Sequence, residues 1–486
     1  MNVIFWTGVF DLKINYRAIG PYQLAWWLRQ NDFSCQVIDF VHHMTAEDLV
    51  KITKKFVTSD TICIGVSSTF WSELNPKNTV TPMSRYKAIT VPDNIRLAIK
   101  EIRDQYPKLK IVLGGHSADF IETEDYQLFD MSLTGDAEDS FLEILQSWKK
   151  SRSIFHSVYR GNRPFVNAAP NLNFKIEHLR HKFLEQDCII PGETLPIEIS
   201  RGCIFKCAFC QYPHIGKTKF DYLRQFEYIQ EELEYNCQTF NTTNYYILDD
   251  TFNDSDYKVK GWYDITQKLN FKLNFTAYLR ADLLHRNVEH AELLRDSGLM
   301  SGFFGIESFH PEASRLMGKG WSGKQGREFL LELLDFWKND VTFHTSFIVG
   351  LPPEKIPDYY STLDFLMENN FHSWVFKSLL ITPGFRLMNS DLDRNPEKYG
   401  FTYDETTREW RTKIMSRQVA DLLSKSLNRH GRDKMKVTSW KALSLMNTGL
   451  TKYELNNTLA STLDWSKITA DQQKFIESYK QKLISL

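Results

Sequence analysis

The chain has 486 residues, of which 42% are hydrophobic, enough to bury a core in each of about three domains of ordinary size. With a formal net charge of −1 it has no bulk field that would attract nucleic acid or an anionic membrane, and it contains neither a secretory signal pattern nor an apolar run of about twenty residues. We therefore expect a cytoplasmic protein with no membrane partner and no nucleic-acid partner.

The first 150 residues alternate strand patterns with helix patterns. Strand patterns lie at residues 2–6, 35–40, 61–66, 110–113 and 131–134, and helix patterns at 22–30, 94–105 and 137–148. This order predicts a doubly wound parallel sheet over residues 1–150. Gly114 and Gly115 follow the fourth strand and Gly135 follows the fifth, at the sheet edge where such folds bind cofactors.

Three further segments follow along the chain. Residues 151–194, interrupted by prolines and asparagines, predict an irregular connector. A second α/β series predicts a partial (β/α)6 barrel over residues 195–385, with strands at 196–200, 245–249, 274–279, 302–306, 343–349 and 374–381 and helices including 222–233 and 326–336. From residue 386 the strand patterns stop, and residues 386–486 predict a helical C-terminal domain.

Three of the seven cysteines lie within eight residues, in the stretch EISRGCIFKCAFCQY. An odd count with such clustering argues against a disulfide framework and for a metal site. Cys203, Cys207 and Cys210 can hold three irons of a 4Fe–4S cubane and leave the fourth iron open to a substrate. The alternative is a zinc site of the three cysteines with His214, although structural zinc sites usually draw their ligands from two separate knuckles.

The cysteine spacing, with the aromatic Phe209 just before the last cysteine, resembles the signature of the radical S-adenosylmethionine (SAM) superfamily. The resemblance implies that the amino and carboxylate groups of SAM chelate the open iron. It also implies that an electron from the cluster cleaves SAM to methionine and a 5′-deoxyadenosyl radical, which takes a hydrogen atom from the substrate. An electron donor such as flavodoxin or ferredoxin is implied as a partner.

Asp249 and Asp250, in YYILDDTFNDS, end the second barrel strand, where this family binds the amino group of SAM. A carboxylate suits an ammonium because a charge-assisted hydrogen bond is stronger than a neutral one. One of the two is expected to bind SAM, and the residues do not decide which. The alternative is that one of them is a helix N-cap.

Three later positions also follow from the resemblance. Arg280, in YLRADLL, is expected to pair with the methionine carboxylate, and Glu307, in FFGIES, to accept hydrogen bonds from the ribose. The alternative for both is an ion pair within the barrel mouth. The stretch SFIVGLPPE resembles the motif that packs against adenine, and Ile348 and Gly350 are assigned to it, whereas Glu354 stands one position later than in the usual form and is not assigned.

The N-terminal part has a resemblance of its own. KIVLGGHSADF and FDMSLTGDAEDSFLEIL resemble strand-loop units of the cobalamin-binding domain that precedes the barrel in one class of radical SAM enzymes. Gly114, Gly115 and Gly135 would let the backbone close on the cobalamin tail, and His116 either touches the corrin or is a loop histidine bonded to backbone. No Asp-x-His-x-x-Gly motif is present, because Asp39 and His42 are spaced by one residue too many, so no lower cobalt ligand comes from that source.

The leading functional hypothesis is a cobalamin-dependent radical SAM methyltransferase that acts on an unactivated carbon of a small molecule or peptide. The first alternative is a cobalamin-independent maturase, an epimerase or cyclase that includes ribosomal peptides among its substrates. An epimerase usually needs a thiol to return a hydrogen atom to its substrate, and no cysteine lies beyond Cys237. A zinc-bound adaptor and a methylthiotransferase are also weighed. The latter needs three more cysteines in the N-terminal domain, which offers Cys35 and Cys63.

Overall fold

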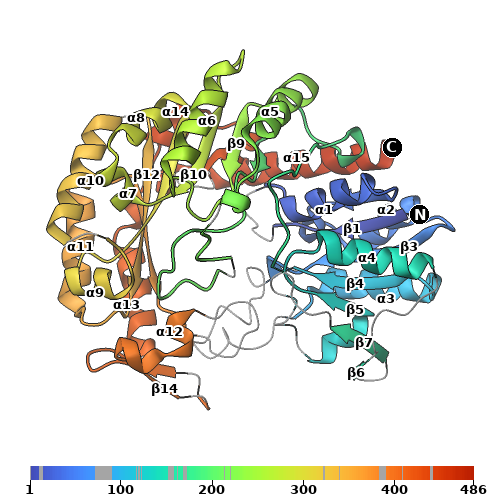
Figure 1. The fold of residues 1–486 in the computed structure, drawn as a ribbon, viewed down its shortest axis with the longest axis horizontal. Helices are drawn as coiled ribbons and strands as arrows, with labels where there is room; N and C mark the ends of the chain where they lie inside the picture. The colour runs from blue at the N-terminus through green and yellow to red at the C-terminus, as the bar shows by residue number, and fades with distance from the viewer. Residues whose placement is uncertain are drawn as a thin grey trace. The chain divides into compact units, whose positions relative to one another are not determined.

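The computed structural model describes residues 2–9, 15–71, 90–115, 118, 121, 123–150, 158–160, 163–167, 172–212, 214–218, 220–320, 323–338, 340–381, 390–404, 406–407, 409–437 and 442–486. Contacts divide the chain into two units, residues 1–175, 180–191 and 469–486 in the first and residues 176–179 and 192–468 in the second. Figure 1 shows both units as ribbons. Among the described residues no helix is both long and apolar enough to span a membrane.

The first unit is built on a seven-stranded sheet with the order β2-β1-β3-β4-β5-β7-β6. Its first five strands are parallel, in the doubly wound arrangement predicted from the sequence. The order reverses between β1 and β3, which in such sheets marks the ligand-binding crevice at the strand carboxyl ends. The strands are β1 (Asn2–Trp6), β2 (Ser34–Ile38), β3 (Thr61–Ser67), β4 (Lys110–Gly114), β5 (Met131–Leu133), β6 (Val158–Arg160) and β7 (Arg163–Asn167).

Helices cover this sheet and complete its core. They are α1 (Ile19–Arg29), α2 (Ala46–Phe56), α3 (Asp93–Gln105), α4 (Glu138–Lys149) and, from far along the chain, α15 (Trp465–Ser485). Helix α2 was not predicted, although Thr45 caps it by accepting a hydrogen bond from the Asp48 backbone N–H and acidic residues fill its first turn. From β1 to α4 the element order otherwise confirms the prediction.

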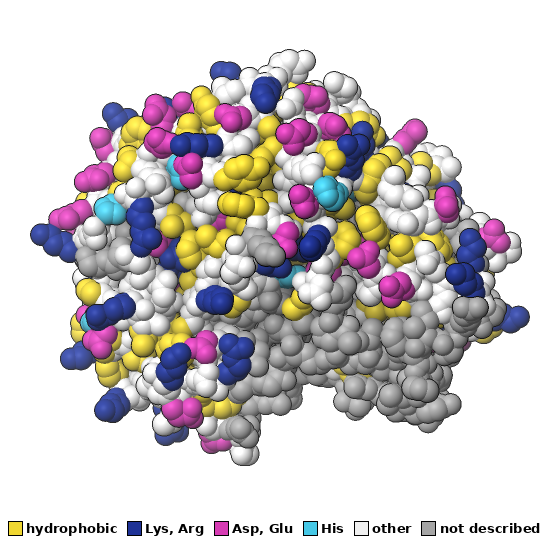
Figure 2. All heavy atoms as spheres, in the orientation of Figure 1, with side chains coloured by type: hydrophobic (Ala, Val, Ile, Leu, Met, Phe, Trp, Pro, Cys, Tyr) yellow, Lys and Arg dark blue, Asp and Glu magenta, His cyan; other side chains and the backbone are white. Residues whose placement is uncertain are grey.

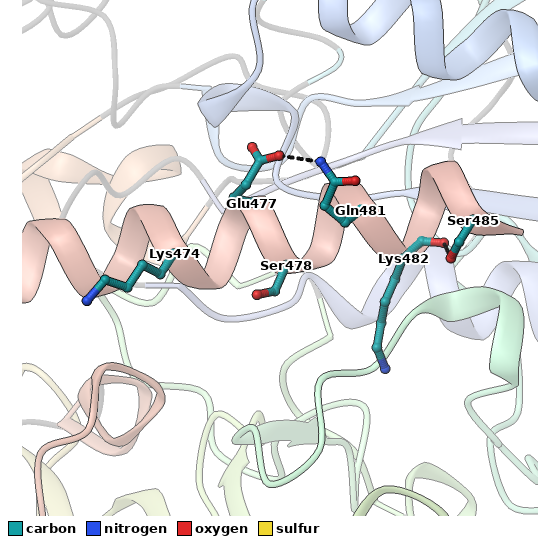
Figure 3. A pocket seen from close by; sticks show the side chains of 6 residues that line it. All are labelled: Lys474, Glu477, Ser478, Gln481, Lys482 and Ser485. Atoms are coloured by element: carbon teal, nitrogen blue, oxygen red, sulfur yellow. Dashed lines mark hydrogen bonds between the residues drawn. The ribbon is translucent and has the colours of Figure 1, made fainter.

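Helix α15 is part of the first unit's core. Phe475, Ile476, Tyr479 and Leu483 of α15 are buried in one cluster with side chains of the sheet, and Figure 1 shows α15 beside the N-terminal elements. The opposite face of α15 is polar, as Figure 3 shows for six residues on successive turns, among them Glu477, which accepts a hydrogen bond from Gln481 at 2.7 Å. The contact units therefore differ from the linear division predicted from the sequence, because residues 469–486 return to the first unit.

The predicted connector is wrong in one respect, because it contains the hairpin β6–β7. Strand β7 pairs parallel with β5, and β6 pairs antiparallel with β7, so both extend the sheet. The connector was predicted because residues 151–194 contain several prolines and asparagines. The sequence also has a Gly-Asn pair between two short runs with β-branched and aromatic residues, a pattern typical of a hairpin that the prediction overlooked.

The second unit contains the six-stranded parallel sheet of the partial barrel, in the order β13-β12-β11-β10-β9-β8. Its strands are β8 (Leu195–Ile197), β9 (Asn244–Ile247), β10 (Asn274–Leu279), β11 (Leu299–Glu307), β12 (Thr342–Val349) and β13 (Ser373–Ser378). Its helices include α5 (Phe226–Phe240), α6 (Asp256–Lys268), α7 (Ala281–Arg286), α8 (Glu289–Asp296), α9 (Pro311–Leu316), α10 (Gly323–Trp337) and α11 (Ile356–Glu368). All six strands were predicted, and the barrel fold is confirmed.

The segment after the barrel is mostly helical, as predicted, with α12 (Asp391–Arg394), α13 (Arg417–His430) and α14 (Lys452–Asn457). The expectation that strands stop after residue 386 is wrong. Strands β14 (Thr402–Asp404) and β15 (Glu409–Arg411) form an antiparallel pair in which Trp410 is fully buried. Each strand has three residues, too few for an alternating pattern to stand out in the sequence.

Lys and Arg side chains are interspersed with Asp and Glu side chains over the described surface that Figure 2 shows. This mixture agrees with a net charge of −1 and gives that surface no field of a single sign.

Candidate functional site

The three clustered cysteines lie on a loop that leaves the end of β8. Gly202 begins the loop with φ +131°, and a Cβ there would lie 3.0 Å from the carbonyl oxygen of His214, so glycine is required by both backbone and space. The Cys203 N–H donates to that carbonyl at 3.0 Å, and the Cys210 N–H donates to the Cys207 carbonyl at 3.0 Å. The sequence thus folds the three thiols into one ordered loop.

The spacing of the thiols does not suit a single zinc ion. Tetrahedral zinc–thiolate bonds of about 2.3 Å place two sulfurs about 3.8 Å apart. Among the described residues, the one group of three metal-ligating side chains whose ligand atoms all lie within 4.8 Å of one another is Asp256, Glu289 and His290, so the three thiols are spread more widely. In a cubane each thiolate binds a different iron, so the thiols need not converge on one ion.

Burial raises the pKa of the Cys210 thiol to about 12 and also raises the pKa of Cys203. Positive iron must therefore offset the cost of the buried thiolates.

Asp249 is a structural residue that ties this loop to β9. Its carboxylate accepts hydrogen bonds from the backbone N–H groups of Ile199 and Ser200 at 2.9 and 3.0 Å and from the Ser200 hydroxyl at 2.6 Å. The Lys258 ammonium, fully buried on α6, pairs with it at 2.6 Å. With its oxygens engaged in this way, Asp249 does not offer a carboxylate to a ligand.

Asp250 is the open member of the acidic pair. The residue is exposed at the surface, and the Tyr212 hydroxyl donates a hydrogen bond to its carboxylate. Protein atoms packed around the carboxylate desolvate it and, together with the neighbouring Asp249 charge, raise the pKa of Asp250 to about 7. The alternative that one of the pair is a helix N-cap is wrong, because Ser255 caps α6 by accepting from the Lys258 N–H. Of the two, Asp250 has the geometry of a ligand for a cation.

Arg280 follows β10 and is held by a bidentate ion pair with Asp282, at 2.9 and 2.6 Å. Its third branch, Nη1, donates to Cys207 Sγ at 3.5 Å, and its guanidinium stacks over the Phe205 ring at 4.0 Å. The predicted alternative, an ion pair within the barrel mouth, is therefore present. The guanidinium contacts the cysteine loop itself.

Glu307 ends β11 at an irregular position. Its φ is +67° and the β11–β12 register shifts between Gly305 and Glu307, a strained conformation of the kind found at functional sites. The Lys319 ammonium lies 3.4 Å from its carboxylate and donates to the Gly305 carbonyl at 2.9 Å. Lys319 also lies 5.9 Å from the centre of the Phe209 ring, so it links β11 to the cysteine loop.

Gly350 and Glu354 form the turn after β12. Gly350 has φ +108°, and a Cβ there would clash with the Trp410 ring, so glycine is required. The Glu354 carboxylate, 4% exposed, accepts from the Ser308 hydroxyl at 2.8 Å through Oε1, whereas its buried Oε2 has no hydrogen-bond partner. Burial raises the pKa of Glu354 to about 8. Ile348, on the same strand, is 8% exposed.

In the first unit, the predicted glycines lie at the carboxyl edge of the sheet. Gly115 and Gly135 have φ +102° and +92°. A Cβ on Gly115 would lie 3.0 Å from the Thr69 backbone nitrogen, whereas a Cβ on Gly114 would meet nothing closer than 4.0 Å. Gly114 therefore leaves an open cradle that a side chain would fill, which fits a ligand lying on the backbone. His116 lies outside the described residues. Asp39 is bonded to Tyr22 and to the Phe40 N–H.

Comparison with known families now bears on this geometry. The model of the radical SAM superfamily matches residues 197–366, which contain the cysteine loop, Asp250 and Gly350. The chain carries a radical SAM domain. Such a domain implies a 4Fe–4S cluster and SAM, and the prediction of a radical SAM enzyme is confirmed.

Three similar proteins match this chain over more than its radical SAM domain. An uncharacterized methyltransferase of Pyrococcus horikoshii is 24% identical over 396 residues, covering 78% of this chain and 79% of the relative. The solved structure of the radical SAM methyltransferase TsrM from Kitasatospora setae, with tryptophan substrate and a SAM analogue bound, has TM-score 0.62 and 14% identity over 98% of this chain and 99% of that one.

The cobalamin-dependent radical SAM enzyme OxsB, with aqua-cobalamin and SAM bound, has TM-score 0.61 and 16% identity over 98% of this chain and 71% of that one. At these identities the solved structures show a shared fold.

Sequence reasoning missed residues that contact the cysteine loop and hold Asp249 in place. Lys258 pairs with Asp249 and donates to the Ser200 hydroxyl at 2.7 Å, and the Thr251 hydroxyl lies 3.5 Å from Cys203 Sγ. One signal was available. Lys258 stands at helical spacing with Trp262 and Ile265, so a lysine occupies the apolar face of α6, where it needs a buried partner.

Proposed function

We propose that this chain is a cobalamin-dependent radical SAM methyltransferase. The observation that carries the proposal is the ordered three-thiol loop with the open Asp250 carboxylate at the end of the next strand. When bound, the cluster and SAM supply a carbon radical and cobalamin supplies the methyl group that is transferred to the substrate. A small molecule or peptide is the substrate, and a flavodoxin or ferredoxin supplies the electron.

The predicted site residues other than Asp249 and His116 receive a role in this proposal. Cys203, Cys207 and Cys210 hold the cluster as thiolates, and Asp250 accepts hydrogen bonds from the ammonium of SAM. Glu307 orients the ribose, fixed in place by its strained backbone and by Lys319. Ile348 and Gly350 pack against adenine. Phe209 shapes the loop beside Lys319.

Arg280 acts on the cluster side of this site. Asp282 fixes its guanidinium against Phe205 and Cys207, so it steadies the loop and donates to a cluster ligand. This arrangement replaces the predicted contact with the methionine carboxylate. In the first unit, Gly114, Gly115 and Gly135 form the cradle for cobalamin, which the fold shared with TsrM and OxsB supports.

The first experiment tests the radical SAM site. Replacing the three clustered cysteines with Ala in anaerobically reconstituted protein is expected to remove the cluster absorbance and the formation of 5′-deoxyadenosine. A triple variant that still cleaves SAM would overturn the proposal.

A second pair of variants separates the two aspartates. Asp250→Asn is expected to weaken SAM binding by about 10- to 100-fold, the worth of a hydrogen bond to a charged group, with cluster content near wild type. Asp249→Asn is expected to lower thermal stability and cluster content together, because it leaves Lys258 buried without its charged partner. Equal effects of both variants on SAM affinity alone would contradict this assignment.

The third experiment tests cobalamin. Gly114→Val is expected to release hydroxocobalamin that the wild type retains through gel filtration, because the added side chain fills the cradle, where a Cβ has no neighbour closer than 4.0 Å. Gly20→Val, where a Cβ also meets nothing within 4 Å, is the matched control. If the wild type turns over a substrate but holds no cobalamin, the cobalamin-independent maturase takes the place of this proposal.

A further inference from the structure

The two faces of the barrel sheet carry different aromatic side chains. On one face, Phe304 and Phe343 pack against Trp337 of α10, and Phe347 packs against Phe309, all of them buried. This face is the hydrophobic core between sheet and helices. Successive residues of a strand point to opposite faces, so residues 303 and 344 belong to the other face.

That other face has a continuous aromatic row of Tyr278, Phe303 and His344. The three residues are direct cross-strand partners on β10, β11 and β12. The Tyr278 and Phe303 rings lie 4.8 Å apart and tilted by 58°, and the Phe303 and His344 rings lie 4.8 Å apart and tilted by 33°. Contacts at these distances are favourable between ring systems, so the row is a preformed surface of π faces and edges.

Exposure distinguishes this row from the core on the opposite face. Tyr278 and His344 are partly exposed and Phe303 is 9% exposed, whereas Phe304 and Phe343 on the opposite face are wholly buried. Buried aromatic side chains that only fill a core need no access to solvent. An aromatic row that keeps access offers its surface to a ligand.

The row lies on the same face as the residues proposed to hold SAM. His344 stands four residues before Ile348, which is proposed to pack against adenine, so along the strand it lies about 13 Å below that side chain. Tyr278 stands two residues before Arg280, which contacts the cysteine loop, and so lies about 7 Å below it. A molecule resting on the row would therefore lie next to SAM.

One cation accompanies the row. Lys377 of β13 is exposed, and its ammonium lies 6.0 Å from the centre of the Phe303 ring. Burial and the Lys377 charge lower the pKa of His344 to about 3, so its imidazole is neutral at physiological pH, and its Nδ1 lies 2.8 Å from the Ser373 hydroxyl. Among the described residues, Lys377 therefore supplies positive charge beside the row.

We propose that the aromatic row and Lys377 form the substrate-binding face of the barrel, and that the substrate has a planar π system and an anionic group. The planar part lies against the partly exposed Tyr278 and His344, across the edge of Phe303, and the anion pairs with the Lys377 ammonium. The inference rests on the proposed function in so far as the ligand of this face is the substrate of the radical reaction.

Binding of matched probes to the reconstituted full-length chain tests this face. The probes are 2-naphthoate and 2-naphthyl phosphate, which distinguish a carboxylate from a phosphate, with 2-(aminomethyl)naphthalene as the planar cation and decahydro-2-naphthoate as the saturated anion. At least one planar anion is expected to bind about tenfold or more tightly than both of these controls, in isothermal titration.

Variants assign that preference to residues. Lys377→Gln is expected to remove the preference for anion over cation, and Phe303→Leu to remove the preference for planar over saturated. Tyr278→Leu replaces Phe303→Leu if the latter does not fold. Phe336→Leu on α10, whose ring is 44% exposed away from this row, is the control and is expected to change neither preference.

The outcomes separate this inference from the proposed function. The inference is overturned if the wild type binds neither planar anion. It is also overturned if the Lys377 and Phe303 variants keep the same two preferences as the wild type. Cobalamin retention and SAM cleavage are measured on the same preparations. If the wild type retains cobalamin and cleaves SAM but binds neither planar anion, this inference alone is refuted. If the wild type neither retains cobalamin nor cleaves SAM, the proposed function is refuted whatever the probes show.

Discussion

Glu354 provides a sharp test of the electrostatics of the turn after β12. Its carboxyl is buried, with the Ser308 hydroxyl on one oxygen and no hydrogen-bond partner on the other. Burial raises its pKa to about 8, against the opposing effects of the Ser308 and Tyr359 hydroxyls. At neutral pH the native protein therefore holds a proton on Glu354 that the unfolded chain releases.

The sign and size of the resulting pH dependence follow from this difference. An ordinary Glu in the unfolded chain has a pKa of about 4.3, so the native pKa is raised. The contribution to stability is then complete below about pH 4 and is lost as the pH rises through about 8, because the native state binds one more proton than the unfolded state in that window. The free energy of unfolding should fall by about 1.4 kcal/mol per pH unit from this group.

Glu354→Gln keeps the shape and removes the titration. Urea unfolding of wild type and variant, followed by fluorescence at pH 6, 7, 8 and 9, is expected to show the variant gaining about 2–3 kcal/mol relative to wild type between pH 6 and 8, and levelling off above that. Glu332→Gln, at an exposed position on α10, is the control and should show no such gain. A constant difference between wild type and the Glu354 variant across this range would refute a raised pKa.

Three further variants test packing and electrostatics around the two sheets. Lys258→Met leaves Asp249 buried without its charge partner and is expected to cost about 3–5 kcal/mol, seen as a lower melting temperature. Arg280→Lys removes the hydrogen bond to Cys207 Sγ and is expected to lower the cluster's reduction potential by roughly 40 mV in a titration followed by paramagnetic resonance, so an unchanged potential would contradict that contact. Tyr479→Phe removes the acceptor of the Asp39 N–H at 2.7 Å and is expected to cost about 1–3 kcal/mol in urea unfolding.

The sequence predicted the order of the sheets well, because long apolar runs alternate with helical patterns. All six barrel strands and five of the six parallel strands of the first sheet, β1 to β5, were identified, and the cysteine loop was placed after the correct strand. The strands that were missed, β6, β7, β14 and β15, lie in segments rich in polar residues and turn signals and not in long apolar runs, and they depend on partners elsewhere for their hydrogen bonds. The positions assigned as site residues stay predictions, apart from the geometry now described.

The choice between Asp249 and Asp250 shows where sequence reasoning ends. Two adjacent carboxylates at a strand end point to opposite sides, and their roles depend on what each side meets. Asp249 contacts Lys258 and Ser200, which lie on α6 and after β8. The lysine on the apolar face of α6 indicates that it needs a buried partner, but the local pattern does not say which carboxylate supplies it. The same holds for Arg280, whose partner Asp282 is close in sequence but whose contact with Cys207 spans 73 positions.

The return of α15 to the first unit affects how the protein is made. The buried Phe475, Ile476, Tyr479 and Leu483 complete a core whose other members lie almost entirely in the first 190 residues of the chain. During translation, this first domain leaves the ribosome long before its last helix exists, and residues 192–468 are synthesised in between. The apolar surface that α15 covers stays exposed until that helix has been synthesised, because a domain folds as a unit once all its segments are available. The first unit therefore closes only after residues 192–468 have been synthesised, and this interval is when chaperones have exposed surface to bind.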